Sequence, residues 1–140
     1  MMRNRLFVLF AILIRPMFLR GQDCLFAVKV RGGETLRINT VNLKYMSQST
    51  ASSTIIIYGD VRTAYVVDEP IGDIVGRTNG SVLLFTDDKT GKQIGISRTF
   101  LLEARETADS KAVVSAVDAR CRWKAAEAFT SLITALEVCA

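Results

Sequence analysis

The chain has 140 residues, of which 49% are apolar, and it contains only two prolines and nine glycines. This composition permits a folded core and excludes a collagen-like or low-complexity chain. The formal net charge is +4, but residues 1–20 contain four arginines and no acid, so residues 21–140 are neutral overall. A neutral body disfavours nucleic-acid binding, which needs clustered positive charge. The chain has no histidine, the commonest general base and transition-metal ligand.

Three cysteines, Cys24, Cys121 and Cys139, lie far apart in the sequence and form no Cys-x-x-Cys pair. This spacing argues against a zinc site, and we expect neither a metal nor another cofactor. An odd number of cysteines without a disulfide framework favours reduced thiols and a cytoplasmic protein. A single Cys24–Cys121 bridge stays open as an alternative.

Residues 1–20 form a basic and apolar N-terminal extension, in which Leu6 to Ile14 is an uninterrupted run of nine apolar residues. The run is shorter than the ~20 apolar residues that cross a bilayer. It resembles the apolar part of an export signal, but Arg15 and Pro16 follow at once and no small-x-small cleavage site is present. Three interpretations stay open: translation from Met17, an N-terminal helix that packs on the body, or an export signal. Membrane contact is expected only through this extension.

From Cys24 onward, short alternating or β-branched runs predict strands separated by turns. The predicted strands are CLFAVKV (24–30), TLRIN (35–39), NLKYM (42–46), TIIIY (54–58) and TAYVV (63–67), with turns at 31–34 and 59–62 and a polar loop at 47–53. The apolar period then becomes that of a helix near residues 70–75. Pro70 suits the first turn of this helix, with Asp68 or Glu69 as its N-cap.

The segment RGGETLRIN (31–39) has a counterpart 58 positions later, KTGKQIGIS (89–97). The same offset aligns residues 33–75 with 91–133 without a gap, and repeats at a fixed period indicate a repeated structural unit. We therefore infer an internal duplication. The aligned pairs include Gly33 with Gly91, Leu36 and Ile38 with Ile94 and Ile96, Leu43 with Leu101, Ile55 and Ile56 with Val113 and Val114, Asp60 and Arg62 with Asp118 and Arg120, Tyr65 with Trp123, Glu69 with Glu127, and Ile71, Ile74 and Val75 with Phe129, Leu132 and Ile133.

These patterns predict an α+β, β-rich fold of two similar units, each with four or five strands closed by a helix, packed as one pseudo-twofold domain. The first unit is expected in residues 21–78 and the second in 79–140, where AAEAFTSLITALEV (125–138) predicts the second helix. A unit of about 55 residues is marginally stable alone, so a shared core is expected. Tyr65 and Trp123, at equivalent positions, are expected to be largely buried.

A glycine turn, an apolar pair ending in Asn, a Thr-Ile-Ile strand and a Val-x-Glu before a helix follow one another in residues 26–77. In this pattern the segment resembles the small flagellar FlbD (SwrD) family, with a fainter likeness in 83–136. The resemblance implies a ββββ-helix unit and structural positions rather than an activity. It departs from the family at Gly59-Asp60, where the family has Asn-Gly, at Pro70, where it has Ser, and in its two copies. The matching residues are Gly33, Leu36, Ile38, Asn39, Leu43, Thr54, Ile55, Val67 and Glu69.

Two further resemblances carry different implications. INTVNL (38–43) is similar to a stretch of short phage-encoded proteins. FAVKV, NLKYM and GKQIGISRTF resemble pieces of a LytTR DNA-binding domain, in which Ser97-Arg98 matches a Ser-Arg of the final strand region. This resemblance implies Arg98 and Lys92 as DNA contacts. However, the family's His-Arg-Ser segment is absent and residues 76–90 are too few for its intervening elements.

Other candidate sites have simpler structural interpretations. Asp87-Asp88 beside Lys89 is expected to form a hairpin turn rather than a metal or acid–base pair. Gly72-x-x-x-Gly76 lacks the Lys-Ser/Thr ending of a phosphate loop. A nucleophilic serine in 49–53 would need a base, and no histidine exists. In the segment 120–122, alternation predicts two solvated arginines with Cys121 turned inward.

No catalytic, cofactor-binding or metal-binding residue is therefore predicted. We expect a non-catalytic structural or protein–protein interaction module, with a protein partner or self-association and no metal; nucleic-acid binding is disfavoured. The alternative is a LytTR-like DNA-binding domain. Arg98 is expected at the surface, where its replacement by Ala would leave stability nearly unchanged. The protein is expected in the cytoplasm, or exported if residues 1–20 act as a signal.

Overall fold

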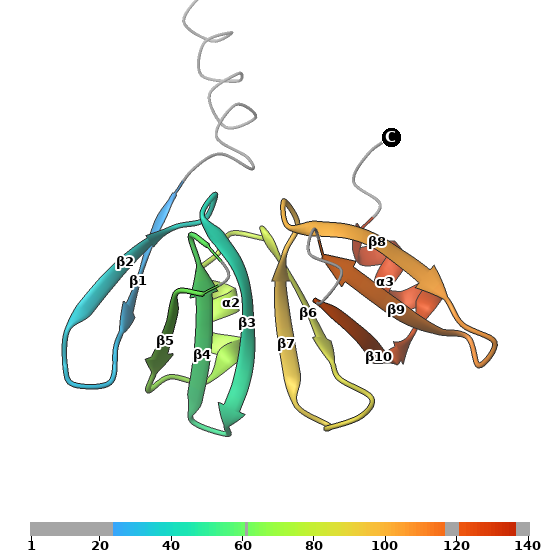
Figure 1. The fold of residues 1–140 in the computed structure, drawn as a ribbon, viewed down its shortest axis with the longest axis horizontal. Coiled ribbons are helices and arrows are strands. Elements are labelled where there is room, and N and C mark those ends of the chain that lie inside the picture. Colours follow the sequence, from blue (N-terminus) through green and yellow to red (C-terminus); the bar gives the residue numbers. More distant parts are fainter. Residues whose placement is uncertain (1–23, 61, 117–120, 137–140) are drawn as a thin grey trace, which may run out of the picture.

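The computed structural model describes residues 24–60, 62–116 and 121–136. The N-terminal extension 1–20, Arg120 and Cys139 lie outside these described residues. Within them, no helix has the length and apolar character needed to cross a membrane. The expected α+β, β-rich class is confirmed, since antiparallel strands dominate and two helices accompany them (Figure 1).

Two units of five strands and a helix follow one another along the chain. The first unit comprises β1 (Leu25–Lys29), β2 (Thr35–Asn39), β3 (Leu43–Thr50), β4 (Ser53–Tyr58), β5 (Ala64–Val67) and α2 (Ile71–Gly76). The second comprises β6 (Val82–Thr86), β7 (Gln93–Ser97), β8 (Leu101–Glu106), β9 (Lys111–Ala116), β10 (Arg122–Ala128) and α3 (Phe129–Leu136).

The offset of 58 found in the sequence also relates the observed elements. It carries β2 onto β7 and β4 onto β9 residue for residue, and it carries the first residues of β3, β5 and α2 onto those of β8, β10 and α3. Only β1 and β6 are related by 57, because the turn between β6 and β7 is one residue longer. Gly33 and Gly91 both adopt positive φ in these equivalent turns, a conformation that a side chain disfavours.

Strand order is also the same in the two units. The paired strands form the groups β1-β2, β5-β4-β3-β7-β6 and β10-β9-β8, all antiparallel. Isolated antiparallel bridges connect these groups, Val30 to Val67 and Asp87 to Ala125. The strand order is therefore 2-1-5-4-3 in the first unit and 7-6-10-9-8 in the second. The two orders are equivalent, because adding five to each strand number of the first unit gives the second.

The units meet through strands that are not equivalent. β3 of the first unit pairs with β7, whereas the first unit's own counterpart of β7 is β2. We call this β3·β7 contact the joint. A twofold contact would pair like with like or would also pair β2 with β8, and the described strands contain neither pair. The joint is thus head to tail, which corrects the expected pseudo-twofold packing.

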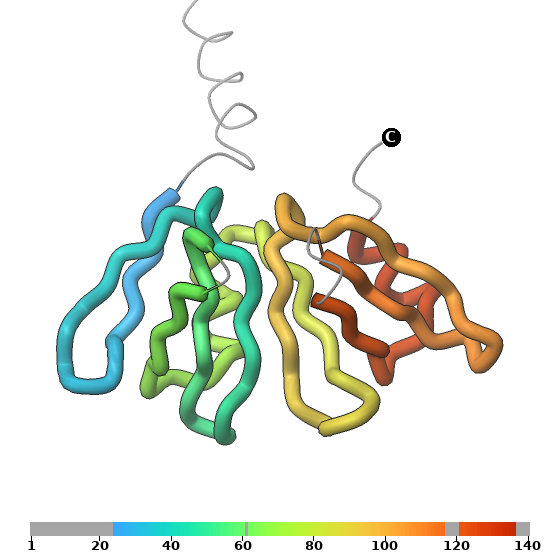
Figure 2. Tube along the Cα trace, viewed as in Figure 1, coloured from blue at the N-terminus to red at the C-terminus, as the bar shows by residue number. Residues whose placement is uncertain are grey.

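Two cores lie on opposite faces of the central strands. Successive residues of β6 alternate between them: Val82 packs in the first core and Leu83 in the second. β3 does the same, with Met46 in the first core and Tyr45 against the second. The two units therefore have separate cores rather than one shared core, and β3, β7 and β6 lie in the middle of the molecule (Figure 2).

Three local expectations are wrong. Residues 47–50 extend β3 instead of forming a loop, because they pair with β4. Pro70 itself is the N-cap of α2, without a side-chain cap. The second helix begins at Phe129, since 125–128 belong to β10 and Ala125 bridges to Asp87.

Candidate interaction surface

The two outermost strands, β2 and β8, each have one open side. Within the described chain β2 pairs only with β1, and β8 pairs only with β9. The hairpin β1–β2 and the strands β8–β10 lie at opposite ends of the molecule (Figure 1). Open strand edges offer backbone donors and acceptors to another strand. They are therefore the first candidates for a contact surface.

Exposed apolar side chains accompany both edges. Leu25 of β1 is 65% exposed and Leu102 of β8 is 64% exposed, well above Val41 at 47%. Single exposed leucines are common on protein surfaces. Their location is what matters here, because one lies on the terminal hairpin and the other on the opposite terminal strand.

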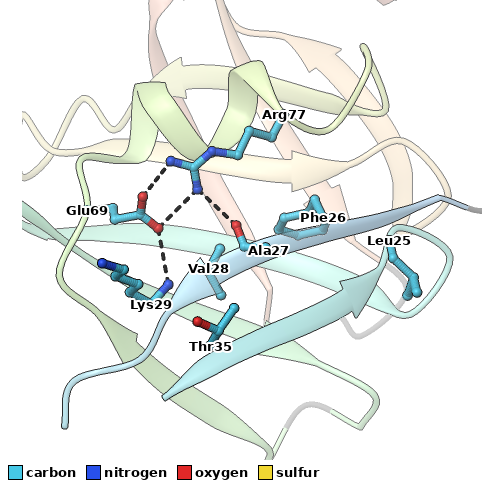
Figure 3. Close-up of a pocket in the computed structure, with 8 residues that line it drawn as sticks. All are labelled: Leu25, Phe26, Ala27, Val28, Lys29, Thr35, Glu69 and Arg77. Atoms are coloured by element: carbon cyan, nitrogen blue, oxygen red, sulfur yellow. Dashed lines mark hydrogen bonds and ion pairs between the residues drawn. The ribbon is translucent and has the colours of Figure 1, made fainter. Parts of the chain in front are cut away.

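A shallow hollow of about 410 Å³ lies beside β1 (Figure 3). Lys29 donates its backbone N–H to Glu69 Oε2 at 3.3 Å. Arg77 donates from Nη1 to the carbonyl oxygen of Ala27 at 3.0 Å and forms an ion pair with Glu69. Side chains thus satisfy the backbone of β1 where it separates from β5. The hollow is lined by Leu25, Phe26, Ala27, Val28, Lys29, Thr35, Glu69 and Arg77.

Glu69 has a counterpart in the second unit with the same role. Glu127 accepts the backbone N–H of Thr86 with both carboxylate oxygens, at 2.8 and 3.0 Å. Hydrogen bonding from Arg77 holds the pKa of Glu69 below its ordinary value, against the opposing effect of burial. The alignment of Glu69 with Glu127 was visible in the sequence, but its role required the fold. Both glutamates act on the protein's own backbone, so they are structural.

The hairpin turn predicted at Asp87-Asp88 is present. The Asp87 carboxylate accepts hydrogen bonds from the Lys89 backbone and from the Thr90 hydroxyl, at 3.3 and 2.8 Å. Asp88 forms an ion pair with Lys111 at 2.7 Å. These contacts stabilise the turn.

A small charge network extends from this turn to β10. Lys124 lies 2.7 Å from Asp109 and 4.0 Å from Asp88. Hydrogen bonding from Lys124 lowers the pKa of Asp109, and hydrogen bonding to Asp88 raises the pKa of Lys111. Each acid therefore faces a lysine. Among the described residues, no group of three or more Cys, Asp or Glu side chains is placed to hold a metal ion.

No protein-family model, curated protein or solved structure matches this chain.

The remaining candidates fall in structural positions. Ser53 is buried beside Thr50, with 2.7 Å between their hydroxyl oxygens. Gly72 and Gly76 lie in α2. Arg122 is exposed, and Cys121 packs against the second core as expected. Cys24 lies beside Thr40 in the first unit, and the structure contains no Cys24–Cys121 disulfide.

The two residues implied as DNA contacts, Lys92 and Arg98, flank opposite ends of β7. Arg98 is partly buried, and its Nη2 donates to the carbonyl oxygen of Ala135 at 2.7 Å. It therefore fastens α3 to the end of β7. Lys92 is exposed in the turn between β6 and β7. The expected surface position of Arg98 is wrong, because its guanidinium is used within the fold.

Proposed function

We propose that this protein is a non-catalytic structural or protein–protein interaction module that contacts its partner through β2 and β8. The observation that carries the proposal is that the two most exposed large apolar residues described lie at the open edges: Leu102 is on β8 itself, and Leu25 is on β1, directly beside β2. Addition of a strand to an open edge supplies backbone hydrogen bonds, and nearby apolar side chains supply specificity.

The resemblance to the flagellar FlbD (SwrD) family is compatible with this proposal. Its matching positions Leu36, Ile38 and Leu43 all pack in or against the first core. They support a shared type of unit and carry no chemistry. A structural role in a larger assembly is what such a unit offers.

Photocrosslinking tests the proposal. A photoreactive amino acid replaces Leu25 or Leu102 in the full chain expressed in its native cells, and replaces Asp73, an exposed residue of α2, as the matched control. We expect discrete crosslinked products from both edge positions and none from Asp73. Equal labelling from all three positions, or none from any, would remove the support for edge-mediated contact.

Duplex DNA provides the contrasting test. In an anisotropy titration at about physiological salt, we expect no tight binding by the full chain, because the charge of residues 21–140 is balanced. The Arg98→Ala variant should bind DNA as weakly as the parent. It should also lose about 1–2 kcal/mol of stability through the lost bond to Ala135. Tight, salt-sensitive binding abolished by this substitution would favour the DNA-binding alternative instead.

A further inference from the structure

We propose that copies of this chain associate head to tail, with β8 of one copy pairing antiparallel with β2 of the next in the register of the joint. The proposal rests on the proposed function and names its partner as a second copy. The joint pairs β3 with β7, and the repeat relates β3 to β8 and β7 to β2. The two open strands of each chain, β8 and β2, are therefore the counterparts of the two strands that pair in the joint, β3 and β7.

The joint supplies the expected register. Its residue pairs are Tyr45 with Ile96, Met46 with Gly95, and Ser47 with Ile94. Adding 58 to each β3 residue number and subtracting 58 from each β7 residue number gives the expected pairs between β8 of one copy and β2 of the next. They are Glu103 with Ile38, Ala104 with Arg37, and Arg105 with Leu36.

The central pair has a different composition in the two contacts, and the pair between copies is the larger one. In the joint, Gly95 leaves room for Met46: a Cβ at Gly95 would lie 3.3 Å from the methionine Cε. Between copies the large and small members are exchanged, since Arg37 faces Ala104 in place of Gly95 facing Met46. The smaller Ala104 takes the place of Met46, so the space beside Arg37 is wider than the space beside Gly95 in the joint.

A cluster of three aromatic residues in the joint is replaced by polar residues in the contact between copies. In the joint the Tyr45 ring lies 5.2 Å from Trp123 and 6.3 Å from Phe100, measured between ring centres. The corresponding residues between copies are Glu103, Tyr65 and Asn42. A carboxylate can accept hydrogen bonds from a tyrosine hydroxyl and from an amide. The three polar residues can therefore contact one another across the two copies, through hydrogen bonds in place of the aromatic contacts of the joint.

Leu25 completes the correspondence. Its counterpart in β6 is Val82, which is 7% exposed because the joint covers it in the first core. Leu25 is 65% exposed in the single chain. In the proposed contact it would cover the open side of the second core, next to Ile133, which is the counterpart of Val75. The repeat therefore predicts that the neighbouring copy covers the exposed side chain of Leu25.

Because the contact joins different surfaces, it leads to a growing or ring-closed series rather than to a closed pair. Charged residues on edge strands can also serve to block such pairing. Arg37 and Glu103 would then keep the chain monomeric. Pairing between copies predicts a mass in solution above that of one chain, whereas blocked pairing predicts the mass of a single chain, so a mass measurement distinguishes the two roles of these charges.

Sedimentation equilibrium of the full chain under reducing conditions tests the proposal. We expect the average mass to rise with concentration beyond that of one copy. Ala104→Lys places a cation opposite Arg37 and should weaken association about two- to fivefold, as like charges in directly opposite strand positions do. Arg37→Glu, at an exposed position, should also weaken it by removing the side chain that fills the space opposite Ala104. Combining the two creates an opposite-charge pair, with Lys at 104 facing Glu at 37, and should restore association.

Ala126→Lys is the matched control, because Ala126 is an exposed alanine on the interior strand β10. It should leave the association unchanged. A chain that stays monomeric at all concentrations, or association indifferent to Ala104→Lys and Arg37→Glu, would overturn the proposal. Crosslinks from Leu25 or Leu102 to a different protein, together with a monomeric chain, would overturn self-association while leaving the proposed function intact. Absence of both would overturn both.

Discussion

At the scale of single residues, equivalent positions of the repeat have acquired different surroundings. Trp123 and Tyr65 were both expected to be largely buried, but each is only partly buried. Trp123 contacts Tyr45 and Phe85 at the wall between the units. Tyr65 stacks on Tyr58 with ring centres 5.6 Å apart, at the outer side of the first unit. The difference arises because only the second unit's aromatic residue faces the joint.

Replacing Trp123 by Ala should therefore be more damaging than replacing Tyr65 by Ala. We expect the tryptophan change to lower the free energy of unfolding by about 2–4 kcal/mol, somewhat less than for a fully buried ring. The tyrosine change should cost about 1 kcal/mol, since it removes one stacked pair near solvent. Urea denaturation of the two variants beside the parent measures both values. Equal losses would contradict the assignment of Trp123 to the joint.

At the scale of elements, the joint depends on how closely β7 approaches its neighbours. A Cβ at Gly95 would lie 3.1 Å from Val82 Cγ1, 3.3 Å from Met46 Cε and 3.4 Å from Val75 Cγ2. These atoms come from β6, β3 and α2. Gly95 therefore allows three elements to converge on one strand, and its role is close packing rather than backbone freedom.

Substitutions of glycine should show this difference. Gly95→Leu overfills the contact and should destabilise the protein by about 1–3 kcal/mol. Gly72→Ala, in α2 with open space around its Cβ, should instead stabilise by about 0.5–1 kcal/mol through helix propensity. Chemical denaturation measures both changes in the free energy of unfolding. Because the two changes are expected to have opposite signs, each variant serves as the control for the other. A neutral Gly95→Leu variant would show that the joint has room to spare.

At the scale of the whole molecule, the described residues contain both cores and every paired strand. The first described strand begins at Leu25, and the core residues identified within the described part of the chain follow it. Stability of the two-unit body should therefore come from these elements. The extension 1–20 lies outside the described residues, and its role has to be tested on the protein itself.

Removal of residues 1–16 should leave a cooperatively folded body. We expect thermal unfolding followed by circular dichroism to remain a single sharp transition, because both hydrophobic clusters are retained. Loss of cooperative unfolding would show that Leu6 to Ile14 contributes to a core. Mass spectrometry of the native protein determines separately whether the extension is cleaved.

The sequence by itself determined the repeat and most of its elements. Alternation in TLRIN and the β-branched run TIIIY identified strands because one strand face is buried and side chains alternate. The offset of 58 held in the structure because both units bury the same periodic positions, such as Ile38 and Ile96. These are local patterns, and local patterns can be read without the fold.

Only the tertiary structure decided how the units are joined and where the open edges lie. The two faces of β6 belong to different cores, with Val82 in the first and Leu83 in the second, and this division depends on the fold. The helical pattern from Ala125 was overridden where Ala125 bridges to Asp87 and Glu127 binds Thr86. Strand pairing between distant segments is not encoded in the period of either strand. It depends on how the folded units are placed in space, and in this structure β3 pairs with β7 while β2 and β8 remain at the ends.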